Sequence, residues 1–176
     1  MGNNKSIFGW KSVFENYGVK DFIIDSIIPT IISALLCVVI YCSGSDMLEQ
    51  IKHILSLGIA VVPSMVALIL AAYTIMLSFI LSETMSKLKK TSNGRSLIQT
   101  INSSFAACLL VSTITIIVML IVSSVANLSI EIEHPNRVNY PIYFIICYLL
   151  IYSVCVLIGV VVDIFNSGQT VLIEND

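Results

Sequence analysis

Charged residues are scarce in this sequence. Of its 176 residues, 9 are Lys or Arg and 11 are Asp or Glu, so charged side chains make up only 11%. An average soluble domain carries about a quarter. Hydrophobic residues make up 57%, and the mean hydropathy is +0.95. These values exclude a disordered chain. They also argue against a soluble domain, whose surface needs more polar groups, and they predict an integral membrane protein.

Charge is nearly absent from four stretches that are long enough to cross a bilayer. A spanning helix needs about 20 mostly apolar residues, and the stretches cover 22–42, 54–81, 105–128 and 141–165. Strands of a membrane barrel would be about ten residues long and would alternate apolar with polar residues. The sequence therefore predicts an all-α integral membrane protein with a four-span membrane domain over residues 22–166.

The basic residues predict the orientation of these spans, because Lys and Arg are enriched in cytoplasmic segments. Lys52 and Arg137 lie in the connections after the first and third spans. The other basic residues lie before the first span or between the second and third, and they are Lys5, Lys11, Lys20, Lys87, Lys89, Lys90 and Arg95. We therefore expect a multi-pass protein with both termini and the central connection in the cytoplasm.

Residues 1–21 combine aromatic side chains with few charges. Trp10 and Phe14 recur at helical spacing, and such a face suits the headgroup layer of a membrane. The segment is predicted to form an N-terminal interfacial amphipathic helix. The alternative is a docking surface for another protein.

The central connection, residues 82–104, is predicted to be a cytoplasmic helical hairpin. Thr91 to Gly94 have the composition of a turn, and Ser96 is a candidate cap for the helix that follows. The basic cluster of this hairpin attracts anionic lipid or docks an acidic partner; its members are Lys87, Lys89, Lys90 and Arg95. Residues 167–176 are predicted to form a cytoplasmic tail.

Small and polar residues recur along the spans at steps of four and three. In lipid, helices associate through such residues, and the period favours a left-handed bundle. The clearest stripe lies in the second span and comprises Ala60, Ser64, Ala67, Ala71, Thr74 and Ser78. The fourth span contributes a stripe that includes Gly159, and the stripe of the third span, which includes Ser112 and Thr115, is weaker. Helix packing is favoured over a pore lining.

Two acidic residues, Asp25 and Asp163, lie within the predicted spans. Intramembrane ionisable groups are candidate functional sites. Each is placed about one turn from the cytoplasmic end of its span, where it reaches headgroup water or pairs with a nearby Lys. The alternative is an acidic ring in an oligomer that attracts cations.

No motif for catalysis, cofactor binding or metal binding is found. The sequence has neither a His-Glu-x-x-His zinc motif nor a Gly-rich phosphate loop, and it has no Gly-x-Ser-x-Gly elbow. Its only histidines are His53 and His134. We therefore expect no enzymatic activity, no cofactor and no metal. The net charge of −2 gives no sign of direct nucleic-acid binding.

In layout, the chain resembles the small four-span proteins of bacterial phage-defence operons, most of all the membrane component of the Kiwa system. The shared features are the size, four spans with both ends inside, Pro63-Ser64 followed by a small-residue run with Tyr73, and Asn166-Ser167-Gly168-Gln169 after the last span. The resemblance implies a homo-oligomeric sensor in the bacterial inner (cytoplasmic) membrane that holds a cytoplasmic DNA-binding effector.

These observations favour a non-enzymatic oligomeric membrane sensor or scaffold in anti-phage defence. Its expected partners are membrane lipid, further copies of the chain, with a tetramer as the candidate assembly, and a cytoplasmic effector protein. Two alternatives stay open, namely a pore-forming or channel-like membrane effector and a bacteriocin or toxin immunity protein.

Overall fold

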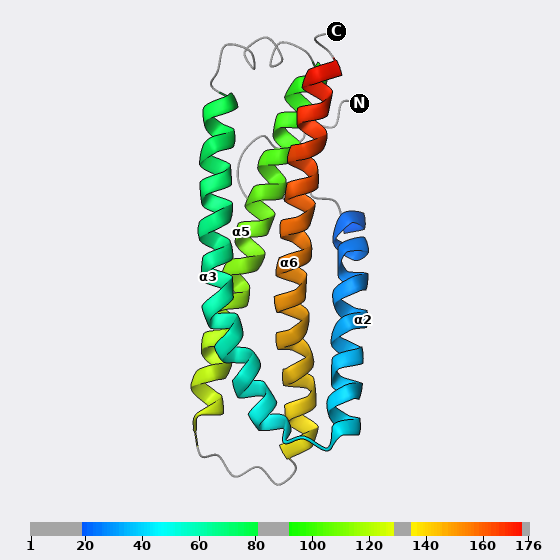
Figure 1. Cartoon of the computed structure of the whole chain (residues 1–176), viewed down its shortest axis with the longest axis vertical. Coiled ribbons are helices and arrows are strands. Elements are labelled where there is room, and N and C mark those ends of the chain that lie inside the picture. Colours follow the sequence, from blue (N-terminus) through cyan, green and yellow to red (C-terminus); the bar gives the residue numbers. More distant parts are fainter. Residues whose placement is uncertain (1–18, 81–91, 129–134, 174–176) are drawn as a thin grey trace, which may run out of the picture.

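Four long helices make up the described part of the chain. The computed structural model describes residues 19–80, 92–128 and 135–173. The helices are α2 (Val19–Ser43), α3 (Met47–Ile80), α5 (Ser92–Ala126) and α6 (Pro135–Ile173) (Figure 1). Each contains a segment that is long and apolar enough to cross a membrane. The prediction of an all-α membrane protein with four spans is confirmed.

Three helix boundaries differ from the predictions. Residues 19–21 belong to α2 and not to a separate interfacial helix, whose remaining residues lie outside the described part. α5 begins at Ser92, so the turn predicted at Thr91–Gly94 is wrong from Ser92 onward. Ser and Asn are common in turns but are equally favoured where helices begin. α6 continues to Ile173, through most of the predicted tail, because no proline stops it after Phe165.

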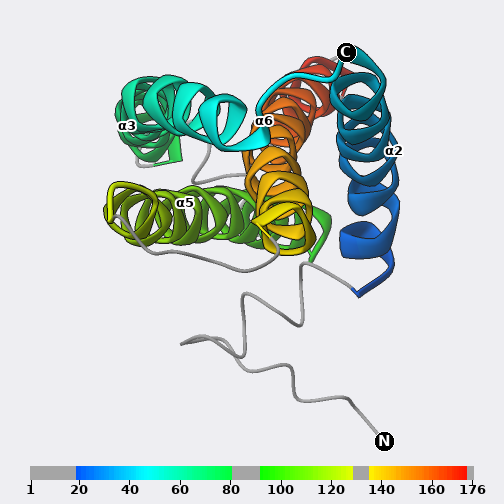
Figure 2. The same cartoon turned by 90° about the horizontal axis from the view of Figure 1, so that it is seen from below.

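α6 is the central helix of the bundle. It packs against α3 and α5 on one side and against α2 on the other, and α3 also packs against α5. Figure 2 shows α6 between α2 and the α3–α5 pair. The arrangement is therefore a three-helix unit with α2 attached to one of its members, rather than a closed ring of four. Only 11% of the candidate span of α2 is buried. The expected left-handed crossing stays a prediction.

A tight turn joins α2 to α3. Gly44 has a φ of 64°, a conformation that glycine adopts without steric cost. The Asp46 Oδ1 atom accepts a hydrogen bond of 3.0 Å from the Leu48 N–H, which satisfies one of the free donors at the start of α3. α3 then runs without a break through Pro63, and its direction changes along its length (Figure 1). We call the end of the molecule that contains the turn between α2 and α3 the α2–α3 end. The opposite end, where α3 ends and α5 begins, is the α3–α5 end.

Two apolar clusters hold the helices together, one towards each end. The cluster towards the α2–α3 end involves all four helices, and its buried members are Ile40, Met47, Ile51, Leu55, Val62, Met119, Tyr143, Ile146 and Cys147. The cluster towards the α3–α5 end involves α3, α5 and α6, and its buried members are Ile69, Ile101, Phe105, Cys108, Tyr152, Val156 and Val160. The buried members of the second cluster include no residue of α2, which agrees with the peripheral position of that helix.

Gly58 marks a close approach of α3 to its neighbours. A Cβ atom built on Gly58 would lie 2.5 Å from the end of the Met119 side chain on α5 and 3.0 Å from Leu150 Cδ1 on α6. A Cβ on Gly159 would meet nothing within 4 Å. Both glycines lie inside helices, so they form a matched pair for mutagenesis.

We expect Gly58→Leu to destabilise the fold by about 1–3 kcal/mol, because a larger side chain overpacks the α3–α5–α6 contact. Gly159→Leu is the control, and its stability should equal or exceed that of the wild type, because glycine is a poor helix former. The measurement is unfolding in mixed detergent micelles. Equal loss of stability in the two variants would contradict the close approach at Gly58.

Candidate functional site

Asp163 lies at the contact between α5 and α6. Its carboxylate Oδ2 accepts a hydrogen bond of 2.6 Å from the Ser104 hydroxyl, and Ser104 itself is buried. A hydrogen bond to an ionised group is stronger than one between neutral groups, and it offsets part of the cost of placing a carboxylate in an apolar setting. The structure shows a serine of the neighbouring helix as one partner of this carboxylate, and the headgroup water or lysine expected from the sequence stays a prediction.

Asp25 lies beside the apolar part of α6. Its side chain is near Cys155, inside the apolar segment Arg137–Asn166 of α6. Its neighbour Ser26 accepts a hydrogen bond of 3.0 Å from the Tyr148 hydroxyl. The cause is the stagger of α2, whose first residues lie well short of the ends of α3, α5 and α6 at the top of Figure 1. The position of Asp25 about one turn inside its own span stays a prediction.

Hydroxyl groups pair in the interior between α5 and α6. The Thr115 and Ser153 side-chain oxygens lie 2.9 Å apart, and both residues are buried. Each hydroxyl is also bonded to its own helix, Thr115 to the Val111 carbonyl and Ser153 to the Leu149 carbonyl. In lipid such contacts join helices that apolar packing alone would not orient. The weak stripe predicted on the third span is thus a packing face, since Ser112 and Thr115 are both buried.

A further polar contact joins α3 to α5. The Tyr73 hydroxyl donates a hydrogen bond of 2.6 Å to Asn102 Oδ1. The Tyr73 ring also lies against the buried Phe105, with ring centroids 5.2 Å apart. An aromatic ring of this kind packs on its apolar face while its hydroxyl reaches a polar partner. The four interhelical contacts thus use hydroxyl, amide and carboxylate groups, and they fix how the helices sit against one another.

These polar groups do not converge on one reactive centre. Within residues 19–80, 92–128 and 135–173, no group of three His, Cys, Asp or Glu side chains is arranged to hold a metal ion. The hydroxyls of Ser33 and Ser112 are buried without a hydrogen-bond partner in the same part of the chain. The contacts are spread along the length of the bundle as pairs, which suits the positioning of helices.

The clearest predicted packing stripe faces outward. All six of its residues on α3 are exposed, namely Ala60, Ser64, Ala67, Ala71, Thr74 and Ser78. The buried face of α3 instead carries mostly large apolar residues, such as Ile51, Leu55 and Ile69. The stripe therefore does not pack against the other described helices. The same holds for Gly159, which is exposed on α6.

Several predicted binding residues lie beyond the described side chains. Trp10, Phe14, Lys87, Lys89 and Lys90 fall outside the described residues. Arg95 belongs to the first turns of α5, before the apolar segment Ile98–Ala126. The structure therefore places the backbone of one member of the predicted basic cluster at the α3–α5 end.

Two helices continue beyond the predicted spans at the α3–α5 end. α5 starts at Ser92, before the predicted span 105–128, and α6 ends at Ile173, after the predicted span 141–165. Figure 1 shows both helix ends at the top of the molecule, above the start of α2. The α3–α5 end therefore carries helical structure that the predicted spans do not require.

Sequence reasoning missed Ser104, Asn102 and Ser153, although each takes part in a contact between helices. Their partners are 59, 29 and 38 residues away in the chain. A lone Ser or Asn in an apolar helix gives no sign of its partner, because it can equally bond to its own helix. Comparison with protein-family models, curated proteins and solved structures gave no match to this chain.

Proposed function

We propose that the chain is a non-enzymatic oligomeric membrane scaffold that holds a cytoplasmic effector protein at the bilayer. The observation that carries the proposal is the extension of α5 and α6 beyond the predicted spans 105–128 and 141–165 at the same end of the bundle. Four helices that served only to cross the membrane would not need to extend beyond it. Helical turns that project from it provide an ordered surface to which a soluble protein can bind.

The charge near this end favours an acidic partner. The connection between α3 and α5 contains Lys87, Lys89 and Lys90, and Arg95 follows in the first turns of α5. A basic patch steers a partner of opposite charge and fixes its orientation. It also attracts anionic lipid, and the two roles are compatible. The orientation with both termini in the cytoplasm is part of this proposal.

Self-association through α3 is the second element of the proposal. Lipid-facing positions elsewhere on the bundle carry large aliphatic side chains, such as Ile31 and Leu35 on α2. The exposed small residues of α3 instead lie between larger ones, including Leu68 and Leu70. A face of this shape lets a second helix approach closely. The tetramer stays the candidate assembly.

The biological setting rests on the resemblance to the membrane component of the Kiwa system. On that basis the scaffold would sense phage attack at the bacterial inner membrane and hold an effector that acts on phage DNA. The chain itself would contact lipid and protein but not nucleic acid.

The test is affinity purification of the full chain from its native host in mild detergent. We expect a soluble protein to copurify in a fixed ratio to the chain. The double variant Lys89→Glu and Lys90→Glu should reduce retention of the partner about tenfold. Reversal of two charges removes attraction to an acidic partner, and we expect the dissociation constant to rise about tenfold. Lys52→Glu is the matched charge reversal at the other end and should leave retention unchanged. Equal retention by all three proteins would contradict the proposed docking surface.

A further inference from the structure

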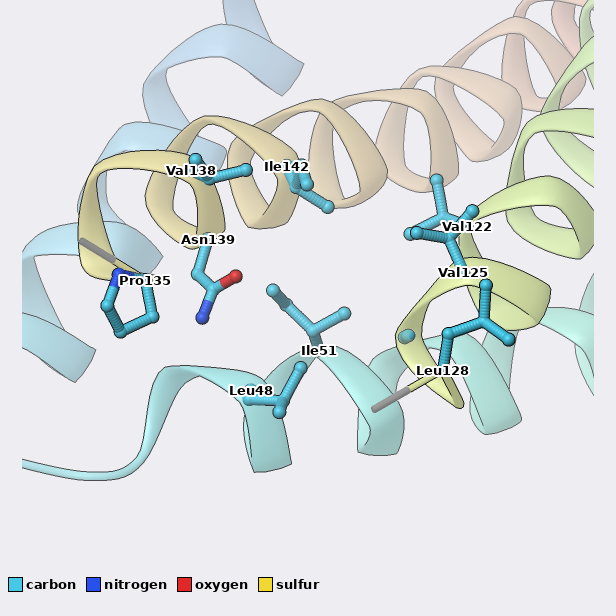
Figure 3. Close-up of a pocket in the computed structure, with 10 residues that line it drawn as sticks. Leu48, Ile51, Val122, Val125, Leu128, Pro135, Val138, Asn139 and Ile142 are labelled. Atoms are coloured by element: carbon cyan, nitrogen blue, oxygen red, sulfur yellow. The ribbon is translucent and has the colours of Figure 1, made fainter. Parts of the chain in front are cut away.

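A small apolar pocket lies at the α2–α3 end, where three helices meet. Its volume is about 170 Å³. Its walls come from the start of α3, the end of α5 and the start of α6 (Figure 3), and its lining residues are Leu48, Ile51, Val122, Val125, Ala126, Leu128, Pro135, Val138, Asn139 and Ile142. Asn139 is the one polar residue among them, and Figure 3 shows it pointing from α6 toward α3. The pocket is independent of the proposed docking surface at the other end.

The position of the pocket along the bundle suits the boundary between hydrocarbon and headgroups. The predicted spans of the three helices begin at residue 54, end at residue 128 and begin at residue 141, all close to the lining residues. Leu128 and Val138 are exposed as well as lining it, so that the pocket communicates with the surroundings of the bundle. In a membrane, the groups available at this depth are the acyl chains of lipids.

Two cationic residues are next to lining residues in the sequence. Lys52 follows Leu48 by one helical turn, on the same side of α3, and Arg137 lies in the first turn of α6; both are exposed. Among the described residues, neither forms an ion pair. Of the nearby acids, Asp46 caps α3 and Glu49 is exposed. Lys52 is therefore available to an anionic group near the start of α3.

We propose that this pocket binds one acyl chain of a phospholipid whose phosphate lies near Lys52. Pockets for whole drug-sized ligands occupy roughly 300–1,000 Å³, and the smaller volume here fits one part of a single narrow chain. The apolar side chains that line the pocket favour a hydrocarbon, because they make van der Waals contacts with it. The Asn139 amide provides a hydrogen-bonding group within the same pocket.

The experiment uses the full chain in vesicles of phosphatidylethanolamine and phosphatidylglycerol. The probe is phosphatidylglycerol with a photoactivatable diazirine in its acyl chain, and the adducts are mapped by mass spectrometry. We expect adducts to concentrate on Ile51, Val122 and Ile142, well above those on Ile31 and Val39, which are exposed on α2.

Two variants separate a bound chain from ordinary contact with bulk lipid. Ala126→Phe fills the pocket and should lower the yield of adducts there about tenfold. Exclusion of about two methylene groups of the lipid from the pocket is enough to weaken its binding tenfold. Ile121→Phe is the control, since Ile121 is exposed on the same helix and does not line the pocket. Lys52→Gln should lower the yield with phosphatidylglycerol severalfold and leave the yield with a phosphatidylcholine probe unchanged.

The proposal is wrong if adducts in the wild-type pocket are no more frequent than on exposed α2. In that case another group occupies it, and residues 129–134, which connect two lining residues, are the first to examine. It is also wrong if Ala126→Phe and Ile121→Phe give the same adduct pattern as the wild type. None of these outcomes bears on the docking of an effector at the α3–α5 end.

Discussion

Leucine at both Ala67 and Ala71 should separate the copies of this protein in detergent. The proposed contact places small residues of α3 against a second chain, and its strength depends on the close approach that they allow. Both alanines are exposed and lie one turn apart on α3. Two leucines would hold the helices apart along that turn. We expect the dissociation constant to rise about a hundredfold, equivalent to two decades of affinity.

The measurement is the mass of the protein–detergent complex by light scattering at several protein concentrations. The wild type should give a multiple of the chain mass, and the double variant should give the chain mass. Ala34→Leu supplies the control, because Ala34 is also exposed but lies on α2, away from the stripe. If the wild type is already monomeric, or if the double variant retains the full mass, α3 does not mediate assembly.

The four spans were predictable because lipid imposes a simple rule. A segment that crosses hydrocarbon must be apolar over its whole length and satisfy its own backbone hydrogen bonds. That rule acts on each helix separately, so it can be applied to the sequence without knowledge of the other helices. It does not determine where a helix ends beyond the membrane. The start of α5 at Ser92 and the end of α6 at Ile173 were therefore not predicted.

The packing faces were harder to predict, because lipid and protein interiors are both apolar. The stripe of small residues on α3 was the clearest in the sequence, yet its members are exposed, whereas the weaker stripe with Ser112 and Thr115 is buried. Small residues indicate that a helix can approach closely, and they do not say which helix approaches. The inner face of α3 includes Ile51 and Leu55, residue types that are equally common on faces toward lipid.

The neighbours of Asp25 on α6 could not be predicted from its own span. Counting from the start of the apolar run places it about one turn inside. Its actual environment depends on how far α2 extends along α6, and the contact of Tyr41 with Tyr140, at 6.1 Å between ring centroids, helps to set this register. Such a contact joins residues that are distant in the sequence, and periodicity within one helix contains no information about it.

Truncation of Phe105 is expected to cause the largest loss of stability of any single core substitution discussed for this protein. Phe105 is 1% exposed and lies within the apolar cluster that joins α3, α5 and α6, against the ring of Tyr73. Phe105→Ala would leave a cavity among three helices, and cavities of this kind cost about 3 kcal/mol. The measurement is reversible unfolding in mixed micelles, followed by circular dichroism.

The control for this prediction is the same substitution at Phe165, which is 64% exposed on α6. In water, both truncations would change the exposure of apolar surface. In a membrane, a lipid chain replaces the lost contacts of an outward-facing ring, so Phe165→Ala should change stability by less than about 0.5 kcal/mol. A cavity inside the bundle is not refilled in this way, because the surrounding side chains relax only in part. Equal effects at the two positions would mean that Phe105 faces lipid, and the three-helix unit around α6 would then have to be rearranged.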